Sequence, residues 1–88
     1  MYNYLVEFVG TVFFIYVILA TGNPFAIGAA LALVIALAKN TSGGHVNPAV
    51  SLTMASAGKL PTTELFPYII AQCFGGLVAY QLYLRFKV

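Results

Sequence analysis

Long apolar runs with almost no charge dominate this sequence of 88 residues. The first run extends from Tyr4 to Ala20 and is broken only by Glu7, Gly10 and Thr11. Charged residues make up 7% of the chain, whereas soluble domains carry about a quarter. Because a helix needs about 20 mostly apolar residues to cross the hydrocarbon core of a bilayer, this run predicts a membrane-spanning helix.

Three such helices fit into the chain, and turn residues separate them. We expect spans over residues of about 4–21, 25–41 and 63–85. These spans and the shorter segment between the last two predict an all-α, multi-pass integral membrane protein with one domain over residues 1–88. Two of the helices carry small residues at every fourth position, a spacing that lets helix backbones approach closely in lipid. These residues are Gly28, Ala32 and Ala36, and then Ala71, Gly75 and Ala79.

A polar, glycine-containing segment over residues 42–57 interrupts the apolar pattern. Asn47 and Pro48 suit the N-cap and the first position of a helix. A helix from Pro48 to Ala57 is roughly 15 Å long, about half the hydrocarbon thickness. Irregular backbone is tolerated inside a bilayer only within protein or along water. We therefore expect a re-entrant loop and half-helix that line a polar path, where carbonyls and a helix N-terminus favour neutral solutes over cations.

Three segments together resemble the aquaporin, or major intrinsic protein, family. They are Ser-Gly-Gly-His-Val-Asn-Pro-Ala-Val-Ser at 42–51, Val-Glu-Phe-Val-Gly-Thr at 6–11 and Ala-Gln-Cys-Phe-Gly-Gly at 71–76. The resemblance covers nearly the whole chain and is to the first of that family's two inverted repeats. Each repeat has three helices and an Asn-Pro-Ala half-helix, and the two half-helices meet at mid-membrane. The chain is about half of a family member, so a family-type pore would need a second copy or a different partner.

The resemblance implies roles for particular residues. The pore signature would be Asn47, Pro48 and Ala49. The carbonyls that line the pore would come from Gly43, Gly44 and His45. Glu7 and Gln72 would support the loop through hydrogen bonds.

The resemblance also implies an apolar selectivity filter. Val50 stands where the family's second repeat places its filter arginine, and Ile27 occupies the filter position of the second helix. Ile35 and Gly44 would join them if a second copy replaced the missing repeat. Such a constriction would lack the positive charge that helps to repel cations, which argues against strict selectivity for water.

The charged residues bear on how two copies meet. With three spans, Lys39 and Lys59 fall on one side of the membrane, and Arg85 and Lys87 fall on the other. The excess of positive charge that usually sets orientation is therefore almost absent. We expect insertion in both orientations and an antiparallel homodimer that recreates the inverted repeat. By analogy with the family's tetramers of pores, four dimers would make one assembly.

Two functions are compatible with these observations. The first is a passive channel for water or small neutral solutes such as glycerol. The second is a membrane structural or assembly protein that keeps the fold but does not conduct. We expect no enzyme, because no nucleophile and base are paired, and no cofactor. His45 has no second histidine or acidic partner at metal-ligand spacing, and the four basic residues form no patch for nucleic acid.

Overall fold

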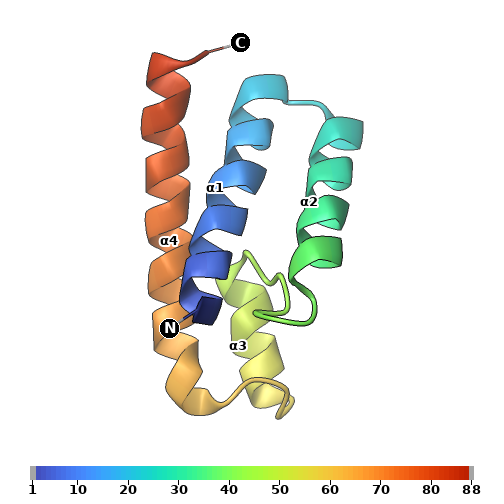
Figure 1. Ribbon diagram of the computed structural model, residues 1–88, viewed down its shortest axis with the longest axis vertical. Helices are drawn as coiled ribbons and strands as arrows, with labels where there is room; N and C mark the ends of the chain where they lie inside the picture. Colours follow the sequence, from blue (N-terminus) through green and yellow to red (C-terminus); the bar gives the residue numbers. More distant parts are fainter. Residues whose placement is uncertain (1, 88) are drawn as a thin grey trace.

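The computed structural model describes residues 2–87 and contains four helices (Figure 1). They are α1 (Tyr2–Thr21), α2 (Pro24–Ala38), α3 (Pro48–Ser56) and α4 (Thr62–Arg85). The all-helical architecture is as expected; residues 1 and 88, the ends of the predicted domain, lie outside the described part of the chain. α1 and α4 are long and apolar enough to cross a membrane. At 15 residues, α2 is about 22 Å long, shorter than the hydrocarbon core.

The core of the bundle is the packing of α4 against α1. A Cβ atom at Gly75 would stand 2.9 Å from the carbonyl oxygen of Phe8 and 3.1 Å from Cβ of Thr11. Only a glycine permits this approach, because real side chains do not come so close to backbone atoms. Ala79, one turn further along α4, is completely buried. Small residues on α4 thus bring the two long helices together.

α2 packs on α1 with a different face from the one that carries its glycine. Ala30, Val34 and Ala38, four residues apart, are buried. Gly28 is exposed, and a Cβ atom added there would meet nothing within 4 Å. Ala32 and Ala36 are also exposed. The small-residue stripe of α2 therefore lies on the outside of the single chain.

Hydrogen bonds at both ends of α2 explain where this helix starts and stops. Oδ1 of Asn23 accepts bonds from the backbone N–H groups of Phe25 and Ala26, at 2.9 and 3.0 Å. At the other end, the N–H groups of Thr41 and Gly43 both donate to the carbonyl of Ala38. These bonds satisfy a terminal carbonyl and turn the chain away. α2 consequently ends at Ala38, three residues before the expected bound of 41.

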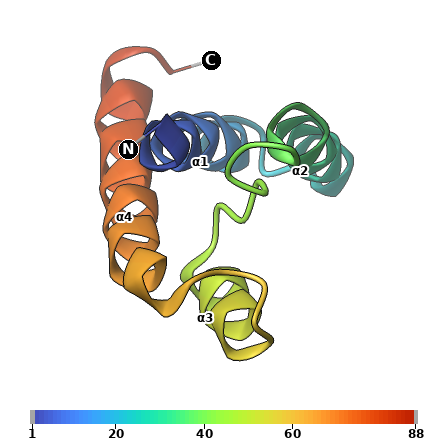
Figure 2. The ribbon, with the colours of Figure 1, turned by 60° about the horizontal axis from the view of Figure 1, so that its bottom comes forward.

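The segment after α2 turns back into the bundle before α3 begins. In Figure 1 the N-terminus of α3 points toward the interior, and its C-terminus lies at the end where α4 starts. α3 has nine residues, so it is about 14 Å long and cannot cross a bilayer alone. It packs against α4 and does not approach α2. Figure 2 shows the connecting segment running between these two separated helices.

Candidate pore loop

The carboxylate of Glu7 holds the loop that precedes α3. Glu7 lies on α1 and is completely buried. Its Oε2 accepts hydrogen bonds from Oγ of Ser42 at 2.7 Å and from the N–H of His45 at 3.0 Å. Its Oε1 accepts bonds from the N–H of Val46 at 2.8 Å and from Nε2 of Gln72 at 2.9 Å. All four partners are donors, so the four acceptor positions of an ionised carboxylate are used.

A second group of hydrogen bonds joins α3 and α4 to the same loop. Oγ of Ser51, on α3, lies 2.8 Å from Nε2 of Gln72 and 2.8 Å from Nδ1 of His45. The hydroxyl of Tyr68, on α4, donates to the carbonyl of Ser42 at 2.8 Å. The Tyr68 ring also lies against the imidazole, with ring centroids 5.2 Å apart. Three separate elements therefore fix the loop.

Of the two expected supports, Glu7 bonds to the loop directly, whereas Gln72 bonds to Glu7 and to Ser51 of α3. Other members of the network were missed. Ser42 and Ser51 are the first and last residues of the motif at 42–51, and both are buried. Tyr68 precedes Gln72 by four residues, so both side chains lie on one face of α4. Gln72 was already expected to support the loop. A search of α4 for side chains four residues away from it would have identified Tyr68.

The loop backbone adopts conformations that ordinary residues avoid. Gly43 and Gly44 have φ angles of 95° and 66°, as expected for two glycines in an irregular segment. A Cβ atom at Gly44 would also stand 3.0 Å from Cα of Ile35. Val46 has φ of 45° although it is β-branched, a strain of about 1–3 kcal/mol. Burial of Val46 and its bond to the Glu7 carboxylate hold this conformation.

The backbone N–H groups of the loop form hydrogen bonds within the protein, whereas several of its backbone carbonyls do not. The N–H of Gly44 donates to Oγ of Ser42, and the next two N–H groups donate to Glu7. Within residues 2–87, no donor is bonded to the carbonyls of Gly43, Gly44 or His45. Three successive carbonyls of the loop therefore lack a hydrogen-bond donor in the part of the chain that the structure describes.

Asn47 stands at the junction of the loop and α3. Its side chain is exposed, and its Oδ1 accepts a bond from the N–H of Ala49 at 2.8 Å, which caps the helix. The amide Nδ2 is the group left to donate, and it has no acceptor in the described part of the chain. Pro48 and Ala49 are exposed on the same first turn. This donor thus belongs to the residue two positions after His45, the last of the three residues whose carbonyls lack a donor.

The three residues expected to form a filter are not brought together within one copy. Ile27 and Ile35 lie on α2, whereas Val50 lies on α3, and these helices do not approach each other. Ile35 does lie against Gly44 of the loop. Ile27 is eight residues away from Ile35, which corresponds to about 12 Å along the helix. One copy alone does not close a constriction from these side chains.

Replacing Glu7 by glutamine tests the carboxylate. Glu7→Gln puts an NH₂ group in place of one acceptor oxygen, so two buried donors lose their partner at about 1–3 kcal/mol each. We expect hydrogen–deuterium exchange at the amides of His45 and Val46 to become at least about tenfold faster. Glu64→Gln is the control, because within residues 2–87 the Glu64 side chain accepts its one bond from the hydroxyl of Tyr4, outside the loop. Unchanged exchange in Glu7→Gln would show that the carboxylate does not hold the loop.

Comparison with known proteins agrees with this geometry. The family model described as Major intrinsic protein matches residues 1–87. Aquaporin-8 of Mus musculus is 43% identical over 89 residues, covering 89% of this chain and 34% of the relative. Glycerol uptake facilitator protein-like 6 of Lactiplantibacillus plantarum is 38% identical over 88 residues, covering 90% of this chain and 41% of the relative. Aquaglyceroporin-2 of Rhizophagus irregularis is 47% identical over 64 residues, covering 68% of this chain and 20% of the relative.

No solved structure matched the chain, and the chain spans well under half the length of these curated relatives. The family match nevertheless extends over almost every residue, including Glu7, the loop and Gln72. The two long apolar helices are consistent with insertion into a membrane. The protein belongs to the major intrinsic protein family and is an integral membrane protein of a channel family, not an enzyme.

Proposed function

We propose that this chain is a single aquaporin-like repeat that forms one half of a passive channel for water and small neutral solutes. The observation that carries the proposal is the unequal use of the loop's hydrogen-bonding groups. Its N–H groups bond within the protein, while three successive carbonyls and the Nδ2 group of Asn47 have no partner among residues 2–87. A row of acceptors beside one donor suits molecules that both accept and donate hydrogen bonds.

The chemistry of this path favours neutral solutes. Carbonyls replace part of the hydration shell of a passing molecule, and Asn47 donates to its oxygen. The N-terminus of α3 carries a partial positive charge at the same place, which disfavours cations. The relatives named as an aquaporin and a glycerol uptake facilitator agree with water and glycerol-like solutes.

The selectivity filter that we propose for this channel is apolar. Ile27, Ile35 and Val50 present only hydrocarbon, so no side chain of this set orders a single file of water by charge. Such a constriction passes small uncharged polyols as well as water. We therefore place the selectivity with solute size and neutrality rather than with water alone.

The second half of the pore is the remaining part of the proposal. α3 covers only about half of the bilayer, and Asn47, Pro48 and Ala49 are exposed at its inner end. We propose that an antiparallel second copy places its own half-helix against this end, with four such dimers in an assembly. The even division of Lys39, Lys59, Arg85 and Lys87 between the two sides supports insertion in both orientations. The exposed small-residue stripe of α2 offers this copy a face for close packing.

Osmotic shrinkage of proteoliposomes tests conduction. We expect the protein to accelerate shrinkage, and Asn47→Asp to slow it by about tenfold, for a lost hydrogen bond worth about 1.4 kcal/mol. The aspartate keeps the capping oxygen but removes the N–H donor. Asn23→Asp is the matched control, since Asn23 also caps a helix just before a proline. Shrinkage no faster than in empty vesicles would instead favour the non-conducting structural role.

Thiol labelling tests the antiparallel arrangement. In a Cys73→Ser background, single cysteines are placed at the two ends of α4 by Thr62→Cys and Phe86→Cys. With both orientations present, a membrane-impermeant maleimide should label about half of each variant in sealed vesicles, and all of it after detergent is added. Full labelling at one position with none at the other would show a single orientation and exclude the antiparallel homodimer.

A further inference from the structure

The imidazole of His45 is a further hydrogen-bonding group of the loop, and its neighbours decide which of its two nitrogens carries the hydrogen. His45 is the one histidine in the sequence, and its side chain is half-buried. Its Nδ1 lies 2.8 Å from Oγ of Ser51, and either atom is able to donate in this bond. The direction of the bond follows from the other bonds that Glu7, Gln72 and Ser51 form.

The carboxylate of Glu7 determines how the amide of Gln72 is oriented. Each carboxylate oxygen accepts a bond from a backbone N–H group, one of His45 and one of Val46. Both oxygens therefore act as acceptors. The atom of Gln72 at 2.9 Å from Oε1 of Glu7 is its nitrogen Nε2, because an amide oxygen at this place would face another acceptor. Nε2 carries two hydrogens, and the second is donated to Oγ of Ser51 at 2.8 Å.

The hydroxyl of Ser51 in turn determines the tautomer of the imidazole. Ser51 is completely buried, and its oxygen already accepts the bond from Gln72. Within residues 2–87 its other hydrogen-bond partner is Nδ1 of His45. If Nδ1 were the donor, the hydroxyl hydrogen would be buried without an acceptor, which is costly. The hydroxyl therefore donates to Nδ1, and the neutral imidazole carries its hydrogen on Nε2.

Nε2 of His45 is accessible from outside the chain. In the part of the chain that the structure describes, two buried side-chain atoms lack a hydrogen-bond partner, Oγ1 of Thr11 and Oε1 of Gln72. Nε2 also has no partner there but is not one of these buried atoms. A Cβ atom at Gly43 would stand 2.9 Å from Nε2, so the glycine leaves room for the ring. Nε2 thus lies beside the first of the three residues whose carbonyls lack a donor.

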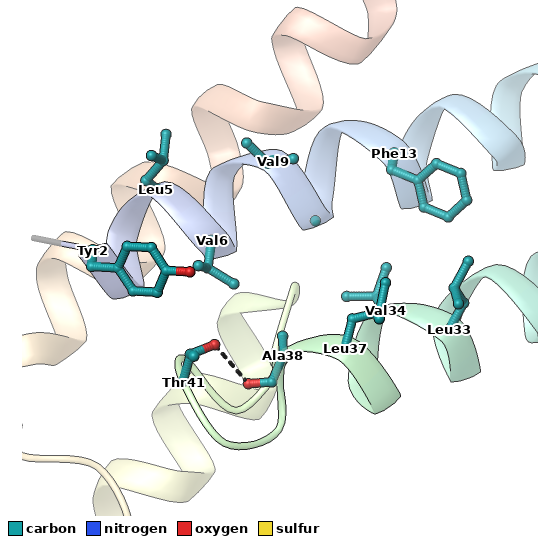
Figure 3. A pocket seen from close by; sticks show the side chains of 11 residues that line it. Tyr2, Leu5, Val6, Val9, Phe13, Leu33, Val34, Leu37, Ala38 and Thr41 are labelled. Carbon is teal, nitrogen blue, oxygen red and sulfur yellow. Dashed lines mark hydrogen bonds between the residues drawn. The ribbon is translucent and has the colours of Figure 1, made fainter.

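The groove between α1 and α2 differs from this site (Figure 3). Its lining is mostly hydrocarbon, and the hydroxyl of Thr41 there donates to the carbonyl of Ala38 at 3.0 Å. At the loop, donors lie near both ends of the three carbonyls. Nε2 of His45 lies beside Gly43, the first of the three residues, and Asn47 lies two positions after the last of them.

We propose that the hydrogen bonds that begin at Glu7 hold His45 as the Nε2–H tautomer, and that this N–H is a second donor to solute beside the loop carbonyls. The proposal rests on the channel function proposed above. A neutral N–H group bonds to the oxygen of water or of a polyol and adds no positive charge to the path. His45 thereby contributes to specificity, whereas Gln72 and Ser51 are positioning residues that fix its tautomer.

Nitrogen NMR of the protein in lipid vesicles tests the tautomer, because every histidine signal comes from His45. The protein carries isotope-labelled histidine and is measured at about pH 8, where an ordinary histidine is neutral. We expect one tautomer, with its hydrogen on Nε2, and a cross-peak that shows transfer of magnetisation from water to this hydrogen. A hydrogen on Nδ1, or the absence of transfer from water, would overturn the proposal.

Variants of Ser51 test the positioning role with the same signals. Ser51→Ala removes the donor to Nδ1, so the Nδ1–H form should gain population and change both nitrogen shifts. Ser51→Thr keeps a hydroxyl and should keep the single tautomer. Ser56→Ala is the control, because the hydroxyl of Ser56 donates to the carbonyl of Leu52, away from the imidazole. Unchanged nitrogen shifts in Ser51→Ala would show that the hydroxyl does not select the tautomer.

The spectrum of the parent protein decides the tautomer even if Ser51→Ala does not fold. A failure of the channel function would appear in the shrinkage of proteoliposomes and would leave the nitrogen signals of His45 as they are. The two proposals therefore fail in different measurements.

Discussion

The structure depends on one buried carboxylate. A charged side chain within a bilayer is costly, about 3 kcal/mol or more at the centre of a helix, and it persists only where partners satisfy it. Glu7 finds four donors, three from the loop and one from α4. The same bonds satisfy backbone N–H groups that lipid would leave unpaired. Glu7 and the irregular loop therefore make each other tolerable inside the membrane.

In the function that we propose, the polar groups of the loop are divided between structure and solute. Because Oγ of Ser42 and the Glu7 carboxylate accept the loop's N–H groups, we propose that the loop carbonyls, which have no donor within residues 2–87, serve a passing molecule. Val46 accepts a left-handed conformation to permit this arrangement. One end of the Asn47 amide caps α3, and we propose that the other end donates to solute. In a helix or a sheet, by contrast, backbone N–H groups would bond to these carbonyls.

Much of this arrangement was predictable from sequence because it depends on local signals. Asn47 and Pro48 mark the start of α3, and the length of the following segment shows that it cannot cross a bilayer. The end of α2 was less predictable, since bonds from Thr41 and Gly43 to a single carbonyl stop the helix early. The conformation of Val46 was missed because only a tertiary contact with Glu7 justifies it. The four-residue spacing of small residues identifies a stripe on α2. It does not show whether this stripe or another face of the helix packs against α1.

The filter shows where prediction from one chain stops. Ile27 and Val50 come from helices that do not approach each other, so their relation depends on what lies between them in an assembly. Small-residue contacts within the chain are already used by α1 and α4 at Gly75. The outward stripe of α2 and the exposed end of α3 are the surfaces left for that purpose.

The central claim is that the inner end of α3 lies deep in the bilayer and faces water. It is tested most directly by a spin label at Ala49→Cys in a Cys73→Ser background, in vesicles, with a label at Ile70→Cys as the lipid-facing reference. The account predicts that the label at position 49 collides readily with a water-soluble nickel complex, although depth measurements place it near the bilayer centre. A label that lies at the headgroup level, or that collides with oxygen but not with nickel as the reference does, would contradict the account.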